Sequence, residues 1–173
     1  IVNNFVCGII ILFEKSLRIG DFVELADGLL GEVREINIRS TLLRTLDNAD
    51  IIVPNADFIS SQVNNWTLND DIRRFSINFS VAYGSDLEQV REAGLKAAEE
   101  VSITLKREGI MPDVLVTELG SSGVECILTI WAQGEWVKRP GWVKSRYLTA
   151  IYNNLRAAEI EIPFPQMDVH MRN

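Results

Sequence analysis

The sequence predicts a mixed α+β protein that is built from several small modules in series. Three observations predict this class: an apolar helical run at the start of the chain, a dense set of short strands after it, and a later βαββα pattern. With 173 residues, of which 47% are hydrophobic and 24% charged, the chain has room for one or two small cores. We expect four modules, over residues 1–17, 18–66, 67–162 and 163–173.

The first module is an apolar run, Gly8 to Phe13, that is ended by Glu14, Lys15 and Arg18. The run is shorter than the roughly 20 residues that cross a bilayer, and it lacks the basic n-region of a signal peptide. Its flanking polar groups favour a position at a membrane interface or a subunit contact, as the end of a longer helical region. An ordinary buried N-terminal helix is the alternative.

The second module, residues 18–66, has the pattern of an all-β domain. Residues 21–25 alternate in polarity, and tight turns are expected at Asp27-Gly28 and Asp47-Asn48. The apolar strand at 51–53 is stopped by Pro54-Asn55. Five short strands in so few residues predict a small, strongly bent β-barrel, whose edges we expect neighbouring copies to share.

The third module begins with a half-buried strand, in which Phe75, Ile77, Phe79 and Val81 fall on one face. The residues from Ser85 to Glu88 have the spacing of a capping box, which predicts a helix behind them. Two strands follow, around 114–116 and 124–131, and Pro140 opens a second helix with Val143, Leu148, Ile151 and Leu155 facing inward. The order βαββα predicts a split, ferredoxin-like sandwich.

The last module contains two prolines, Pro163 and Pro165, which hold the chain extended. The residues after them alternate with the period of a strand, with Met167, Val169 and Met171 on one face and Asp168, His170 and Arg172 on the other. A lone terminal strand pairs most economically with copies of itself. We therefore expect an intersubunit barrel, with the Met/Val face turned inward because narrow barrels fill with apolar side chains.

Sites for other chemistry are few. His170 is the only histidine, so one chain cannot form a His-based metal cluster or a Ser-His-Asp triad, and no cofactor is expected. The net charge of −7 argues against a nucleic-acid surface. Cys126 alternates with apolar residues and is expected in the core. Trp131, Trp136 and Trp142 could form a binding surface or a buried aromatic clasp.

The order of these modules resembles that of the small-conductance mechanosensitive channel (MscS-like) family. Single motifs resemble the family too, and they span nearly the whole chain: Asn4 and Gly8, residues 18–21, 33–36, 39–41, 44–45 with Asp47, 52–55, 81–86 and 163–169. One position departs from the pattern, because Ser16 stands where many members have proline.

The resemblance implies the end of a pore-lining helix, an Sm-like β-domain, an α/β domain and a self-pairing strand. It further implies a homo-heptamer in a bacterial inner membrane, with this region on the cytoplasmic side and lipid contacts through upstream helices. Such a channel opens under membrane tension and releases ions and small osmolytes during hypoosmotic stress. No enzymatic activity is expected.

Two questions stay open at this point. Gly8 could be a flexible point in the helix, or it could allow close helix packing. An RNA-binding module is the alternative function, because small Sm-like barrels and ferredoxin-like sheets both occur there. That alternative would need exposed stacking aromatics, whereas Phe75 and Phe79 fall on the apolar face of their strand.

Overall fold

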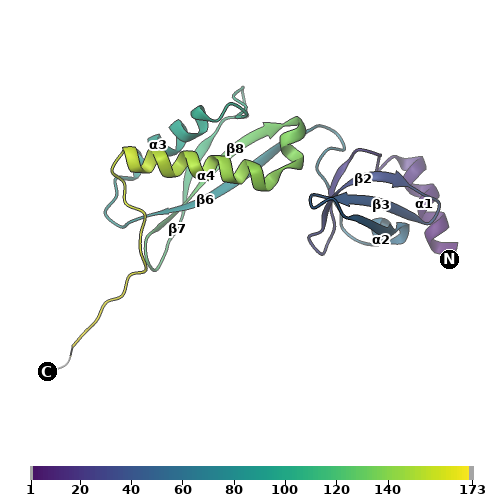
Figure 1. The fold of residues 1–173 in the computed structure, drawn as a ribbon, viewed down its shortest axis with the longest axis horizontal. Helices are drawn as coiled ribbons and strands as arrows, with labels where there is room; N and C mark the ends of the chain where they lie inside the picture. Colours follow the sequence, from purple (N-terminus) through teal and green to yellow (C-terminus); the bar gives the residue numbers. More distant parts are fainter. Residues whose placement is uncertain (1, 172–173) are drawn as a thin grey trace. The chain divides into compact units, whose positions relative to one another are not determined.

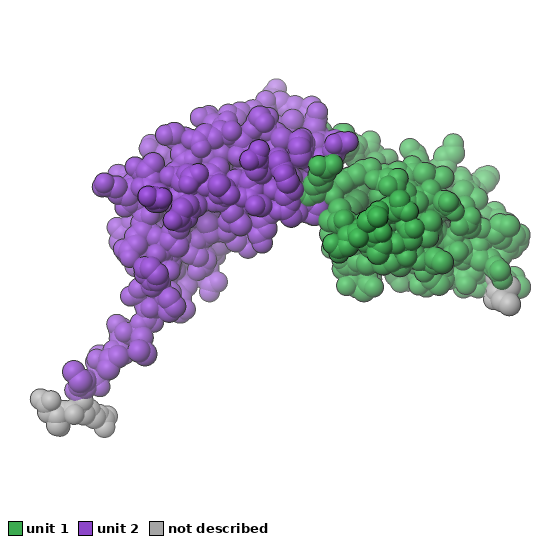
Figure 2. All heavy atoms as spheres, in the orientation of Figure 1, with its two compact units in different colours: residues 1–72, 137–139 green, residues 73–136, 140–173 purple. Residues whose placement is uncertain are grey.

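A computed structural model describes residues 2–171, which form two compact units (Figures 1 and 2). Unit 1 comprises the chain up to Ile72 together with Val137–Arg139. Unit 2 comprises Arg73–Trp136 and the chain from Pro140 onward. Arg172, which was assigned to the terminal strand above, lies outside the described residues.

Unit 1 is a five-stranded antiparallel sheet with two helices. The strand order is β4-β3-β2-β1-β5, so β4 and β5 lie at the two ends. The elements are α1 (Val2–Glu14), β1 (Phe22–Glu24), β2 (Leu30–Ile36), β3 (Ser40–Thr45), β4 (Asp50–Pro54), α2 (Asn55–Ser60) and β5 (Asn64–Asn65).

The core of unit 1 joins α1 to the inner face of this sheet. Ile11 of α1 is fully buried and packs in one cluster with Leu17, Val23, Val33, Leu43 and Val53. The predicted turns are present: Gly28 and Asn48 have positive φ angles of 86° and 63°, which these residue types tolerate. A bulge between Val33 and Glu35 interrupts the register of β2 and bends it.

The helix α1 ends without a proline at Ser16. Lys15 instead adopts a left-handed conformation with φ of 53°, which terminates the helix directly after Glu14. The chain then turns around Asp21, a buried carboxylate that accepts from the Arg18 backbone N–H at 2.8 Å and from Asn65 Nδ2 at 2.7 Å. The turn that follows α1 is therefore held by side-chain hydrogen bonds.

Unit 2 has the predicted order of elements. They are β6 (Ile72–Val81), α3 (Leu87–Glu100), β7 (Asp113–Leu119), β8 (Val124–Gln133), the 3₁₀ helix η1 (Gly134–Lys138) and α4 (Pro140–Ala157). The sheet order is β6-β8-β7, and residues of α3 and α4 share one buried cluster with the sheet (Figure 1). Cys126 lies in this cluster with 2% exposure, as predicted, and its burial raises the thiol pKa.

Two local predictions in unit 2 are wrong. Leu148 is 36% exposed rather than inward-facing, because the neighbouring Tyr147 takes the fully buried position on α4. The cap of α3 is Asp86, not Ser85: the Asp86 carboxylate accepts from the N–H groups of Glu88 and Gln89, while the Ser85 hydroxyl donates to the Ala82 carbonyl. A carboxylate one residue later satisfies the free amides of the first turn directly.

Two of the three tryptophans of the predicted clasp, Trp136 and Trp142, contact each other. Trp136 and Trp142 stack with ring centroids 4.5 Å apart, and Trp136 packs on the core of unit 2. Trp142 remains 38% exposed and carries the Arg146 guanidinium over its outer face. The pair therefore forms a clasp at the start of α4 that is open to solvent on one side.

Candidate functional site

A buried hydrogen-bond network in unit 1 is centred on Asn55, the first residue of α2. We call it the Asn55 network. Asn55 has 0% exposure, and its Nδ2 donates to the carbonyls of Asn37 at 3.0 Å and Ile38 at 3.3 Å. Its Oδ1 accepts from the buried Thr41 hydroxyl at 2.9 Å. The Asn55 N–H donates to the Arg39 carbonyl. One side chain thus fixes the β2–β3 turn, β3 and α2 to one another.

At Gly8, the backbone of α1 packs directly against the Asn55 network. A Cβ atom at Gly8 would lie 2.5 Å from the Ile38 carbonyl oxygen and 2.6 Å from Asn55 Nδ2. Both distances are far below van der Waals contact, so only glycine fits while the backbones stay where they are. The geometry therefore supports the close-packing interpretation of Gly8.

Asn4 lies one turn earlier on the same face of α1. Its Oδ1 accepts a hydrogen bond of 2.9 Å from the Ala56 backbone N–H in the first turn of α2. That N–H has no partner within its own helix, so Asn4 satisfies it from another element. Asn4 and Gly8 thus meet α2 together, and with Ile11 they form the docking face of α1.

The opposite face of α1 is apolar and exposed. Its side chains have exposures from 45% to 86%, at Val2, Phe5, Val6, Ile9, Leu12 and Phe13. A face of this size without polar side chains requires an apolar neighbour such as another helix or lipid. None of the described helices is long and apolar enough to span a membrane.

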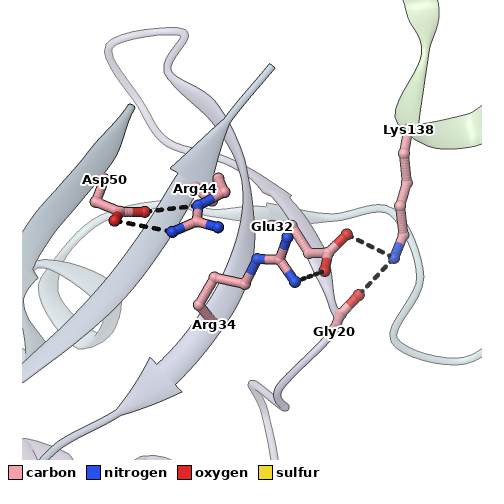
Figure 3. A network of polar contacts seen from close by, with 6 residues as sticks. All are labelled: Gly20, Glu32, Arg34, Arg44, Asp50 and Lys138. Carbon is pink, nitrogen blue, oxygen red and sulfur yellow. Dashed lines mark hydrogen bonds and ion pairs between the residues drawn. The ribbon is translucent and has the colours of Figure 1, made fainter. Parts of the chain in front are cut away.

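Two groups of charged side chains lie on the surface of unit 1 (Figure 3). Arg44 and Asp50 form a two-pronged pair with N–O distances of 2.8 and 2.9 Å. Glu32 pairs with Arg34 at 3.3 Å and with Lys138 at 3.1 Å, and Lys138 Nζ also donates to the Gly20 carbonyl at 2.9 Å. Lys138 thereby fixes its short segment to the turn before β1.

The Arg44–Asp50 pair shifts the titration of both members. The hydrogen bond from Arg44 lowers the pKa of Asp50 below its ordinary value, and Asp50 raises the pKa of Arg44 in return. Both side chains are partly exposed, so these shifts belong to an ion pair at the surface.

The second set of predicted site residues lies elsewhere, at the end of unit 2. Met167, Asp168, Val169, His170 and Met171 are extended and exposed, without regular secondary structure in the single chain. The segment that leads to these residues is held to unit 2 by two hydrogen bonds. Ala82 N–H donates to the Glu161 carbonyl, and Gln166 N–H donates to the Ser122 hydroxyl. The terminal strand remains a prediction, since its partners would come from other subunits.

The sequence patterns did not reveal α2 or the role of Asn55. Asp57 lies in the first turn of α2, which is a helix-start signal that could have been recognised. Among residues 2–171, no group of three or more His, Cys, Asp or Glu side chains could hold a metal ion.

Comparison with known proteins identifies the family. Residues 1–68 match the sequence model of "Mechanosensitive ion channel, beta-domain", and residues 75–162 match that of "Mechanosensitive ion channel MscS, C-terminal". The mechanosensitive channel MscK of Escherichia coli is 39% identical over the whole chain, which spans 15% of MscK. An MscS family protein of Archaeoglobus fulgidus is 36% identical, and the chain spans 59% of it.

A solved structure agrees with the sequence matches. The closed-state crystal structure of Helicobacter pylori MscS superimposes with a TM-score of 0.87 at 29% identity, covering 99% of this chain and 66% of that one. The chain thus spans less than two thirds of each of these relatives. It belongs to the MscS family of mechanosensitive ion channels.

Proposed function

We propose that this chain is the base of a pore-lining helix and the cytoplasmic cage of a channel that opens under membrane tension. The channel releases ions and small osmolytes during hypoosmotic stress. Residues 1–17 end the pore helix, 18–66 form an Sm-like barrel shared between subunits, 67–162 form a ferredoxin-like domain, and 163–173 supply the terminal strand. The names and lengths of the relatives support this division of roles, because MscK and MscS are channels with long segments beyond the matched region.

The observation that carries the proposal is the two-sided character of α1. One side is fixed to the β-domain through Asn4, Gly8 and Ile11. The other side exposes Phe5, Ile9 and Leu12, among others. A helix of this kind can line or seal a pore on one side while a rigid base holds it on the other.

The docked arrangement is assigned to the closed channel, because the similar H. pylori structure is of a closed state. Tension does work through the in-plane area change of membrane spans, which we place outside this chain. The joint at Gly8 and Asn4 then determines how firmly the pore helix is held in its resting position. Weakening the joint lowers the energy needed to leave that state.

Assembly is proposed as a homo-heptamer in the inner membrane, with this region on the cytoplasmic side and with lipid contacts made by helices outside it. The edge strands β4 and β5 of unit 1 and the exposed tail from Met167 to Met171 support self-association. The RNA-binding alternative has no support, since Phe75 is 7% exposed and Phe79 packs on the core. Stacking on bases needs exposed rings.

The proposal is tested in a bacterial strain that lacks its own mechanosensitive channels. The full-length protein is expected to raise survival after a sudden drop in osmolarity, and Ile11→Asp, which places a charge in the core beneath α1, is expected to abolish that protection. Glu14→Gln, at an exposed position of the same helix, is the matched control. Survival equal to that of cells without the channel, with protein present in the membrane fraction, contradicts the proposal.

A further inference from the structure

The edge strand β7 exposes apolar side chains that a folded domain normally covers. Val116 is 49% exposed and Leu119 72%, and we call these two residues the β7 strip. Cross-strand pairs place Val116 and Leu119 on the core face of the sheet, opposite Cys126 and Val124. The strand therefore extends beyond the part of the sheet that the core buries.

A groove of about 460 Å³ lies between β6 and α4 in the same unit. We call it the α4 groove; its apolar lining comes from Phe79, Leu148, Ile151, Tyr152, Leu155 and Ile162. Tyr152 is 51% exposed and Ile162 43% exposed, so the groove is open to the surface. It is one of the concave apolar surfaces of unit 2 and holds no charged lining residue.

The sheet order β6-β8-β7 puts these two surfaces at opposite edges of unit 2. Because the strip and the groove lie at opposite edges, a single two-fold contact between two copies cannot bury both of them. They can meet head to tail, with the strip of one copy in the groove of the next. Head-to-tail contacts close into rings when the rotation permits.

The charges around the two surfaces are complementary. The strand β7 carries Asp113 and Glu118 and no basic residue. The helix α4 carries Lys144, Arg146 and Arg156 and no acidic residue. Lys144 lies one turn before Leu148 and Arg156 one turn after Tyr152, so basic side chains flank the groove along the helix. Opposite charges at a rim set register and partner choice.

We propose that the β7 strip of one subunit docks into the α4 groove of the next subunit around the ring. The inference rests on the proposed ring assembly and adds which faces of unit 2 meet. Val116 and Leu119 fill the groove, and Glu118 at its rim lies toward the basic residues of α4. The contact is one part of a larger interface, because stable interfaces bury well over 1,000 Å².

Disulfide cross-linking in the full-length channel tests the pairing. The double variant Leu119→Cys/Tyr152→Cys is oxidised in detergent and separated on a non-reducing gel. Each subunit then carries one cysteine at position 119 and one at position 152, so it can be bonded to both of its neighbours. We therefore expect a series of covalent oligomers larger than the dimer. The unsubstituted channel, which retains the buried Cys7 and Cys126, gives the background.

Three controls sharpen the test. Mixing Leu119→Cys channels with Tyr152→Cys channels during co-expression should give covalent dimers and nothing larger, because each bond uses one subunit of each kind. Neither single variant should cross-link alone. Lys96→Cys on the exposed face of α3, combined with Leu119→Cys, should stay at background. Dimers from Leu119→Cys alone, or an equal series of covalent oligomers with Lys96→Cys, overturn the proposal.

A charge exchange provides a second, independent measurement. Glu118→Lys should at least halve the yield of covalent oligomers of the cross-linking pair at low salt, and the combination with Arg156→Glu should restore it. If light scattering shows rings of full size but the Leu119→Cys/Tyr152→Cys pair gives no covalent oligomers, this pairing is wrong. The proposed function is not affected by that result. A channel that elutes as a monomer overturns both.

Discussion

At the residue scale, one glycine and one asparagine define how α1 meets its domain. Gly8 brings the helix backbone against the Ile38 carbonyl, and Asn55 supplies the hydrogen bonds beneath it. The sequence alone left Gly8 undecided between flexibility and close packing. Close packing at Gly8 depends on the position of Asn55, which lies 47 residues later in the chain. The residues around Asn55 in the sequence do not indicate that it is buried.

The Asn55 network predicts that substituting Asn55 strongly destabilises the fold. Asn55→Ala removes a donor and an acceptor that serve buried partners, including the Thr41 hydroxyl, and should lower the free energy of unfolding by about 2–4 kcal/mol. Urea denaturation followed by circular dichroism measures the loss. Asn69→Ala, at an exposed position, is the control and should stay within about 0.5 kcal/mol of the unsubstituted chain. Equal midpoints for the two variants would contradict the role of Asn55.

The surface pair Arg44–Asp50 predicts a pH effect of known sign. Because the pKa of Asp50 is lowered in the folded chain, its contribution to stability is present above the ordinary value near 3.8 and is lost as the pH falls through the folded pKa. An NMR titration should show Asp50 titrating below its ordinary range. Arg44→Gln should move that pKa upward, and Arg34→Gln should move it less, since Arg34 contributes least. A larger shift with Arg34→Gln would contradict the assignment.

At the element scale, strands and long helices were predictable because alternation and apolar stripes extend over many residues. The short helix α2 was missed, since six residues after a proline carry little periodic signal. The capping box at Ser85 was a plausible pattern, but Asp86 beside it competes for the same amides and wins. The terminal strand stays a prediction, because a strand made between subunits cannot form in one chain.

The cap assignment gives a prediction for α3. Asp86→Ala should destabilise the domain by about 1 kcal/mol, because two amides of the first turn lose their acceptor. Ser85→Ala leaves those amides paired and should cost less. Thermal unfolding of both variants compares them under the same conditions. If Ser85→Ala proved the more damaging change, the cap would belong to Ser85 after all.

At the scale of the whole molecule, the exposed tail predicts a specific loss of assembly. Deleting residues 166–173 removes Met167, Val169 and Met171, which are 69–90% exposed, while the core of unit 2 lies elsewhere. We expect light scattering of the purified channel to show smaller or dissociating particles, with the circular dichroism of the α/β domain unchanged. Intact rings after the deletion would show that the tail is dispensable for assembly.

The proposed function requires that membrane tension opens the full-length channel from a state in which α1 is docked at Gly8. Current recorded from excised patches under graded suction tests it most directly, in full-length channels carrying Gly8→Ala or Gly141→Ala. Overpacking at Gly8 costs about 1–3 kcal/mol, whereas a Cβ at Gly141 meets no atom within 4 Å. We predict suction-activated currents in all three channels, with Gly8→Ala opening at lower suction and Gly141→Ala matching the unsubstituted channel. Currents that ignore suction, or identical thresholds in all three, would contradict it.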